Sequence, residues 1–319
     1  VKVEEPAVRS AGIKVESVAE LVDKLKNFIE ADLINKLLIS IDSEGQAGIV
    51  RNSIPKPDNV LKRIFFKLVA KAQSPSFIYG PAQGYENRIQ MTLEAAAAAE
   101  CAIEAGVKDV VIRDGGFIRG VADSGLCLIQ DKLPPGIRFT VGPTSIYDVA
   151  KEGFDAAVFL GIHAMAGTKS GVMAHTYSSV SIIEMRLNDK PVGEIYLEAL
   201  QLGVLNIPVI MVCGDADGCE EARRFLGNDL PTVVTKLGLS CHSAISYHPN
   251  DVCNSIKATL RETLKKPLPP AVKPLTDKLT LDVVCTTAQS AKTRATRYGG
   301  KLKSPCSYRI ITGSPLDLG

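Results

Sequence analysis

The sequence of 319 residues lacks the features that mark membrane, secreted and nucleic-acid-binding proteins. No uninterrupted apolar run approaches the roughly 20 residues that span a bilayer, so we expect no membrane partner. The first residues show no basic stretch followed by an apolar one, which predicts a cytoplasmic protein without a signal peptide. The formal net charge is only +2, so there is no electrostatic footprint for nucleic acid.

Short metal-binding motifs are also missing. None of the eight cysteines forms a C-x-x-C pair, and no H-E-x-x-H is present. Without a signal peptide, the cysteines are expected to be reduced thiols that are mostly buried. Any metal site must therefore be assembled from Asp, Glu and His residues in separate segments.

Apolar runs alternate with predicted helices along most of the chain. Hydrophobic residues make up 45% of the sequence and charged residues 23%, as in ordinary globular proteins. Residues 88–105 and 191–202 are predicted helices, the second with Pro191 in its first turn. The runs predict an α/β fold with a mainly parallel sheet and helices on both faces. These runs are residues 37–41, 107–112, 156–162 and 208–213.

The end of the sequence has a different pattern. A connector rich in Lys and Pro occupies residues 264–277. Predicted strands at 279–285 and 308–312 then flank a basic helix at 288–297. This pattern predicts a smaller C-terminal α+β portion. Two further helices are predicted over residues 16–30, with Ser17 as the capping residue, and around residues 60–70.

Acidic and histidine side chains follow the predicted strands, where open α/β sheets gather their functional residues. Asp42 and Glu44 are two residues apart, so in an extended segment they point to the same side. Two such carboxylates repel each other unless a cation lies between them. On this segment alone, a turn or cap role is the more common one for such an Asp42. The residues at these strand ends are Asp42, Glu44, Asp114, His163 and Asp215.

His163, already named, and two further residues have two interpretations each. His163 follows an apolar run and is either a metal ligand or a core histidine. His175, beyond a loop that contains glycine, either returns to the same cleft or stays exposed. Glu194 is either a metal ligand or a helix-start carboxylate that favours the helix dipole. Ligands scattered in this way suit a binuclear hydrolytic site without requiring one.

Four segments together resemble the zinc-dependent D-aminopeptidase family associated with dipeptide-transport operons. The resemblance covers roughly residues 36–319 and implies an α/β fold, a homo-oligomer and bound Zn²⁺, one or two ions per chain. The segments are I-S-I-D-S-E-G (39–45), H-A-M-A-G-T-K-S-G-V-M-A-H-T (163–176), N-D-K-P-V-G-E (188–194) and P-V-I-M-V-C-G-D (208–215).

The resemblance also implies roles for individual residues. The family's metal ligands correspond to Asp42, Glu44, His163 and Glu194, and its catalytic histidine corresponds to His175. The implied reaction is release of an N-terminal residue, D-residues included, from a short peptide or amide. The histidine or zinc-activated water would attack the carbonyl while zinc polarises it.

One family ligand is missing. The family reads Asp-Ser-His after the second strand, whereas this chain reads Asp114-Gly115-Gly116. Losing even a residue that supports a ligand costs about 10–100-fold in metal affinity or activity. Three outcomes are open: Asp114 substitutes, one metal binds, or the protein is a degenerate small-ligand-binding protein that no longer hydrolyses its ligand.

The first residues resemble a different family. Residues 1–27 are similar to the C-terminal tail of the electron-transfer flavoprotein beta subunit. The nucleotide-binding body of that subunit is absent from this sequence, so we infer no electron transfer. We therefore predict a tail-like segment over residues 1–31 and a metallohydrolase domain over residues 32–319.

Overall fold

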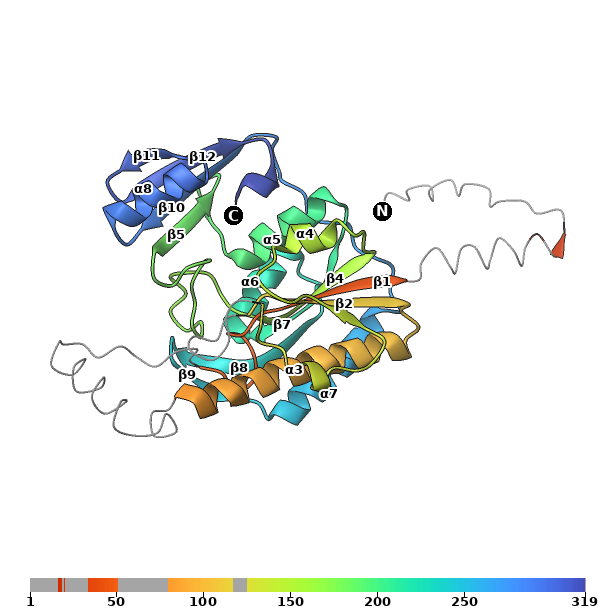
Figure 1. Ribbon diagram of the computed structural model, residues 1–319. Coiled ribbons are helices and arrows are strands. Elements are labelled where there is room, and N and C mark those ends of the chain that lie inside the picture. The colour runs from red at the N-terminus through yellow and green to blue at the C-terminus, as the bar shows by residue number, and fades with distance from the viewer. Residues whose placement is uncertain (1–16, 19, 21–33, 51–79, 117–124, 319) are drawn as a thin grey trace, which may run out of the picture. The chain divides into compact units, whose positions relative to one another are not determined.

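The computed structural model describes residues 17, 18, 20, 34–50, 80–116 and 125–318 (Figure 1). The chain divides into two compact units, residues 1–33 and 34–319. In the first unit, the backbone N–H of Glu20 donates to Ser17 Oγ at 3.0 Å, as expected of a capping serine. Two predicted helices lie outside the described residues: the one around 60–70 and most of the one over 16–30.

The main sheet of the second unit has the strand order β3-β2-β1-β4-β7-β8-β9 over the described residues. Neighbouring strands are parallel except β8 and β9, which form an antiparallel hairpin. The four predicted apolar runs form β1, β2, β4 and β7, which are almost entirely buried. The strands are β1 (Lys36–Ile41), β2 (Asp109–Asp114), β3 (Arg138–Phe139), β4 (Ala156–Ile162), β7 (Val209–Asp215), β8 (Thr232–Ser240) and β9 (Ser243–Ser246).

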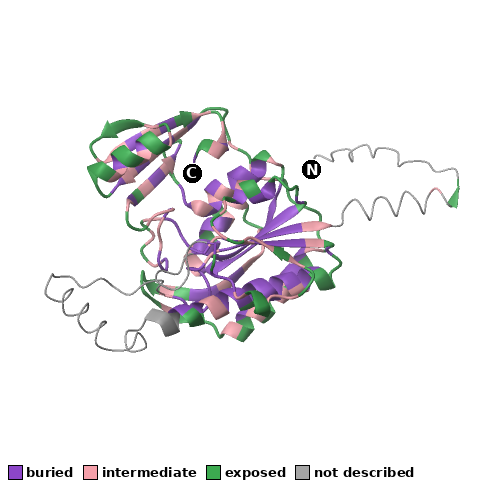
Figure 2. Ribbon diagram, viewed as in Figure 1, coloured by how far each residue is buried: buried purple, intermediate pink, exposed green. Residues whose placement is uncertain are grey.

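Helices cover both faces of this sheet, which confirms the predicted α/β class (Figures 1 and 2). Helices α3 (Gly80–Glu104) and α7 (Pro249–Thr263) pack on one face. On the other face lie α4 (Ile146–Ala150), α5 (Glu194–Val204) and α6 (Ala216–Leu226). Buried alanines of α3 present little bulk, so the helix can lie close to the strands.

A second, antiparallel sheet has the order β11-β12-β10-β5-β6 and packs against α8 (Ala288–Arg297). The predicted C-terminal portion is present, but the sheet also takes β5 and β6 from the middle of the chain. The five strands are β5 (Ile182–Leu187), β6 (Lys190–Pro191), β10 (Leu279–Cys285), β11 (Lys301–Ser304) and β12 (Ser307–Thr312).

The predicted place of Pro191 is wrong. It belongs to the edge strand β6, opposite Arg186, and not to the first turn of a helix. Proline tolerates a sheet edge because it has no N–H to donate to a further strand. Helix α5 begins only at Glu194, after Gly193 as the N-cap residue. This shift makes Glu194 the first residue of the helix.

The strand order positions the candidate site. Strand β1 lies between β2 and β4, and the helices that follow β1 and β4, α3 and α5, cover opposite faces of the sheet. A crevice forms outside the carboxyl ends of two such strands. Asp42 follows β1 and His163 follows β4, so both residues lie at this crevice.

Two other expectations concern thiols and membrane spans. All eight cysteines are free, five are buried, as predicted for most of them, and only Cys241 is exposed. In the part of the chain that the structure describes, no helix is long and apolar enough to cross a membrane.

Candidate metal centre

The loop after β1 carries Asp42 and Glu44 and lies against the end of β4. The N–H of Asp42 donates to the Leu160 carbonyl at 2.9 Å, and that of Gly45 donates to the Gly161 carbonyl at 2.7 Å. A Cβ on Gly45 would lie 1.7 Å from the Ile162 carbonyl oxygen. Only glycine allows this approach, which brings the two carboxylates to the crevice.

A buried lysine of β8, Lys236, also binds the loop after β1. The Lys236 ammonium, fully buried on β8, donates to the backbone carbonyls of Glu44 at 2.5 Å, Gln46 at 2.7 Å and Ile49. Burial lowers the pKa of Lys236 to about 8. An ammonium has three donors, and all three are used here. The backbone on either side of Glu44 is therefore fixed.

Two histidines face the loop from the segment after β4. The Nδ1–H of His163 donates to the Ala164 carbonyl at 3.0 Å, and that of His175 donates to the Met173 carbonyl at 2.8 Å. A carbonyl can only accept, so each Nδ1 carries a proton, and in the neutral form of each ring the lone pair is on Nε2. The rings are stacked, with centroids 4.2 Å apart and planes 11° apart.

Asp215 secures the segment that carries these histidines. One of its carboxylate oxygens accepts from the Gly218 N–H at 3.0 Å and caps α6. The other oxygen accepts from the Val172 N–H at 2.9 Å. Asp215 therefore joins the histidine segment to the end of β7 and does not itself point to the metal cluster.

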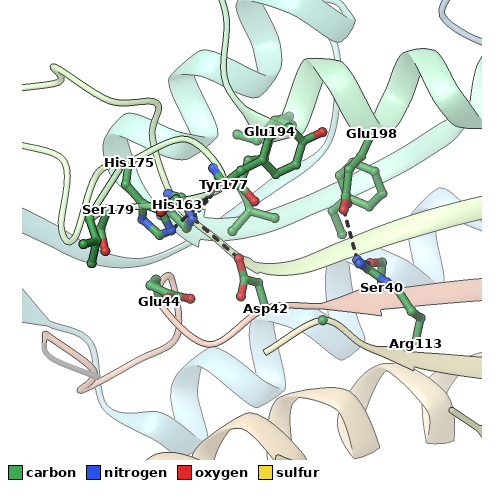
Figure 3. A pocket seen from close by; sticks show the side chains of 16 residues that line it. Ser40, Asp42, Glu44, Arg113, His163, His175, Tyr177, Ser179, Glu194 and Glu198 are labelled. Carbon is green, nitrogen blue, oxygen red and sulfur yellow. Dashed lines mark hydrogen bonds and ion pairs between the residues drawn. The ribbon is translucent and has the colours of Figure 1, made fainter. Parts of the chain in front are cut away.

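The five residues predicted for the site converge (Figure 3). His163 Nε2 lies 3.5 Å from Asp42 Oδ2 and 3.6 Å from Glu194 Oε1, and His175 Nε2 lies 3.7 Å from the same Glu194 oxygen. Ligand atoms about 2.1 Å from a tetrahedral zinc lie about 3.4 Å from one another. The observed separations are thus longer than hydrogen bonds and close to those around a metal.

The ligand atoms form two overlapping sets, each within 4.8 Å. One set is Asp42, Glu44 and His163, and the other is His163, His175 and Glu194. Imidazole nitrogen and carboxylate oxygen are donors that zinc accepts. The residues present therefore fit a zinc site, with His163 common to both sets.

Three carboxylates lie close together at this site, those of Asp42, Glu44 and Glu194. Removal from bulk water, together with the charges of Glu44 and Glu194, raises the pKa of Asp42 well above its usual range. Burial acts to lower the pKa of His163, but the Glu194 and Glu44 charges outweigh burial and raise it. A divalent cation would relieve the repulsion among the three carboxylates.

The cluster lines a pocket of about 550 Å³ that extends to a second polar group. There Arg113 Nη1 donates to Glu198 Oε1 at 3.1 Å and to Ser40 Oγ at 3.0 Å. Tyr177 also lines the pocket, with a left-handed backbone at φ +55°. Its N–H donates to Glu194 Oε1 at 2.6 Å, and strained backbone of this kind concentrates at functional sites.

Asp114 and Gly116 do not join the site. The buried Asp114 carboxylate accepts the backbone N–H groups of Gly116, Cys127 and Leu128 at 2.7–3.1 Å. These bonds engage both of its oxygens, and Asp114 is not among the pocket-lining residues. A Cβ on Gly116 would lie 2.6 Å from Met91 Cε, and Gly116 is not among the pocket-lining residues.

Sequence reasoning missed Glu198, Arg113 and Lys236. Glu198 lies one helical turn after Glu194, so the spacing of two glutamates on one helix face was a usable signal. Arg113 and Lys236 lie within strands, and nothing local distinguishes a strand lysine that binds carbonyls from one that faces solvent.

Comparison with known proteins identifies the family. Residues 35–314 match the family described as D-aminopeptidase, so the chain belongs to the D-aminopeptidase family, as predicted. It is 30% identical over 209 residues to the D-aminopeptidase of Bacillus subtilis (strain 168), a match that covers 64% of this chain and 65% of that protein's length.

One solved structure has a similar fold. It is that of the Zn-dependent D-aminopeptidase DppA from Bacillus subtilis, a self-compartmentalizing protease. The TM-score is 0.69 and the identity 23%, with 89% of this chain and 93% of that chain covered. This likeness confirms the predicted fold.

Proposed function

We propose that this protein is a zinc-dependent aminopeptidase that releases N-terminal residues, D-residues included, from short peptides or amides. The observation that carries the proposal is the convergence of two imidazole Nε2 atoms and three carboxylates at metal–ligand spacing. Membership of the D-aminopeptidase family and the zinc dependence of the similar solved structure support it.

We assign the metal ligands as Asp42, Glu44, His163 and Glu194, which would hold one or two zinc ions. Zinc bound there would polarise the carbonyl oxygen of the scissile bond. The hydrogen bonds of the loop after β1 and of the His163 ring keep these ligands aimed at one point. Such support from behind the ligands is what fixes their orientation.

His175 is the proposed catalytic residue. Its bond to the Met173 carbonyl and its stacking on His163 orient the ring, and its Nε2 lone pair faces the pocket. That nitrogen can take a proton from the attacking group and return it to the leaving amine. The same nitrogen lies in a ligand set, so the experiment must separate the two roles.

A homo-oligomer is the second part of the proposal. The similar solved structure is described as self-compartmentalizing. Apolar side chains are exposed along the β8–β9 hairpin of this chain, at Leu237, Leu239 and Ile245, and a second copy could cover them. Size-exclusion chromatography with light scattering at micromolar concentration should show a multimer; a monomer would contradict this part.

The test of the catalytic role begins with zinc loading, desalting and elemental mass spectrometry. The wild type should retain one or two zinc ions and cleave a panel of D- and L-aminoacyl peptides. His175→Ala should retain zinc and lose about 10²–10⁴-fold in kcat, as expected for a general acid–base residue. His242→Ala is the matched control because His242 is exposed and outside the pocket.

Each other outcome is informative. Loss of zinc in His175→Ala would make His175 a ligand. A zinc-loaded wild type that cleaves no aminoacyl peptide would contradict the enzyme and favour a small-ligand-binding protein on the same fold.

A further inference from the structure

The pocket has two polar ends (Figure 3). The zinc-ligand candidates occupy one end, and Glu198 with Arg113 lies at the other. Glu198 and Arg113 are mostly buried, with 19% and 14% of their side chains exposed. An ion pair withdrawn from water in this way costs desolvation energy, so its presence in a substrate-sized pocket calls for a reason.

Arg113 donates a hydrogen bond to only one of the two carboxylate oxygens of Glu198. Arg113 Nε and Nη2 donate to the Thr144 carbonyl, and Nη1 donates to Ser40 and to Glu198 Oε1. The guanidinium is therefore anchored at three points. Within the described part of the chain, the second oxygen of Glu198 accepts no hydrogen bond. A fixed carboxylate oxygen thus remains for a ligand.

The spacing along α5 fits a substrate that spans both ends. Glu194 and Glu198 lie on the same helix face, and a rise of 1.5 Å per residue separates them by about 6 Å along the axis. In an aminopeptidase substrate, the α-nitrogen is two bonds from the scissile carbonyl carbon. A carbonyl held near Glu194 would place the α-ammonium within reach of Glu198.

We propose that Glu198 binds the α-ammonium group of the substrate and thereby restricts hydrolysis to free N-termini. This inference rests on the proposed aminopeptidase function and adds the subsite that such an enzyme needs. The other acidic side chains lining the pocket, Asp42, Glu44 and Glu194, are assigned to zinc. Arg113 is a positioning residue that aims Glu198, and its charge opposes the burial that raises the pKa of that carboxyl.

The test compares two zinc-binding probes that differ only in the α-amino group: alanine hydroxamate, in D- and L-forms, and propionohydroxamate. Binding to zinc-loaded protein is measured by calorimetry, so no turnover is needed. The wild type should prefer one amine-bearing form by roughly 10–100-fold, as expected for a charge-assisted hydrogen bond. In Glu198→Gln, the preference should fall to about threefold or less.

Matched variants separate charge from folding. Glu220→Gln removes an exposed glutamate of α6 and should keep the wild-type preference. Glu198→Asp retains the charge on a shorter side chain and should keep part of the preference, which also gives a readout if Glu198→Gln folds poorly. Circular dichroism checks the fold of each variant.

The outcomes distinguish the two proposals. Retention of the full preference in Glu198→Gln, or equal affinity of the wild type for both probes, would overturn the ammonium subsite and leave the zinc site standing. Failure of zinc-loaded wild type to bind either hydroxamate would instead count against the zinc aminopeptidase itself.

Discussion

Gly116 occupies the position where the family resemblance leads us to expect a histidine ligand. A side chain there would point at Met91 of α3, because an added Cβ would lie 2.6 Å from Met91 Cε. An imidazole at this buried position would have to displace core atoms, and overpacking of this kind costs about 1–3 kcal/mol. The space beside Gly116 therefore suits a residue without a side chain.

We predict that Gly116→His lowers the unfolding temperature and adds no zinc. Differential scanning fluorimetry and elemental mass spectrometry give the two readouts. The double variant Gly116→His, Met91→Ala makes room for the ring and should recover part of the stability without additional zinc. A rise of one zinc ion per chain in either variant would show that position 116 reaches the site.

The buried carboxyl group of Glu94 should make the stability of the protein depend on pH. It is fully buried on α3, where Oε1 accepts from the Ala47 N–H at 3.0 Å and from Gln90 Nε2 at 2.8 Å. Oε2 has no hydrogen-bond partner in the described part of the chain. Burial raises the pKa of Glu94 from 4.5 to about 7.

The free energy of unfolding should therefore fall as the pH rises from 4.5 to about 7. Between pH 4.5 and 7 the folded state keeps a proton on Glu94 that the unfolded chain has lost, so deprotonation favours unfolding. The gap between the two pKa values corresponds to about 3 kcal/mol. Glu94→Gln abolishes the titration and should gain about that much relative to wild type between pH 4.5 and 7.5.

Urea unfolding of zinc-free protein at several pH values measures this difference. Glu86→Gln, an exposed position on the same helix, is the control and should follow the wild type. Parallel pH profiles for Glu94→Gln and wild type would show that Glu94 is ionised throughout in the folded state.

At the scale of elements, β8 supports a loop that belongs to β1. Lys236 supplies all three donors to carbonyls of residues 44–49, and Thr235 Oγ1 donates to the Gly45 carbonyl. These bonds join segments far apart in the sequence and hold Glu44 in place. Substitution of Lys236 or Thr235 in β8 should therefore lower the affinity of the site for zinc.

Lys236→Met keeps much of the side-chain length but removes a hydrogen bond from a charged donor at each of three buried carbonyls, at about 1.5–3 kcal/mol each. We expect zinc affinity to fall about 10–100-fold, as for other residues that support ligands. Competition with a fluorescent chelator gives the affinity, and Lys301→Met, exposed on β11, is the control. If Lys236→Met does not fold, Thr235→Val tests the same loop more mildly. Unchanged zinc affinity in a folded variant would contradict the coupling.

For the whole molecule, regular patterns were predictable and long-range polar contacts were not. The apolar runs that became β1, β2, β4 and β7 carry their own signal, since strands buried on both faces are continuously apolar. Convergence of Asp42 and His163 followed from their places after β1 and β4.

Other features depend on partners that no local pattern reveals. The recruitment of β5 into the second sheet depends on pairing with β10. The carbonyls that bind Lys236 come from a distant loop. The contact that a Cβ on Gly116 would make with Met91 depends on how α3 packs, and composition carries no sign of it.

Because the chain divides at residue 33, the first unit should be dispensable for the second. The family match begins at residue 35, and in the described part of the chain every residue of the main core cluster lies at or after Ile34. A protein comprising residues 34–319 should therefore keep the unfolding temperature, zinc content and peptide hydrolysis of the full chain. A second truncation that also removes β1 deletes a central strand and the start of the metal loop, so it should not fold. Loss of zinc or of folding in the 34–319 protein would show that the second unit requires the first.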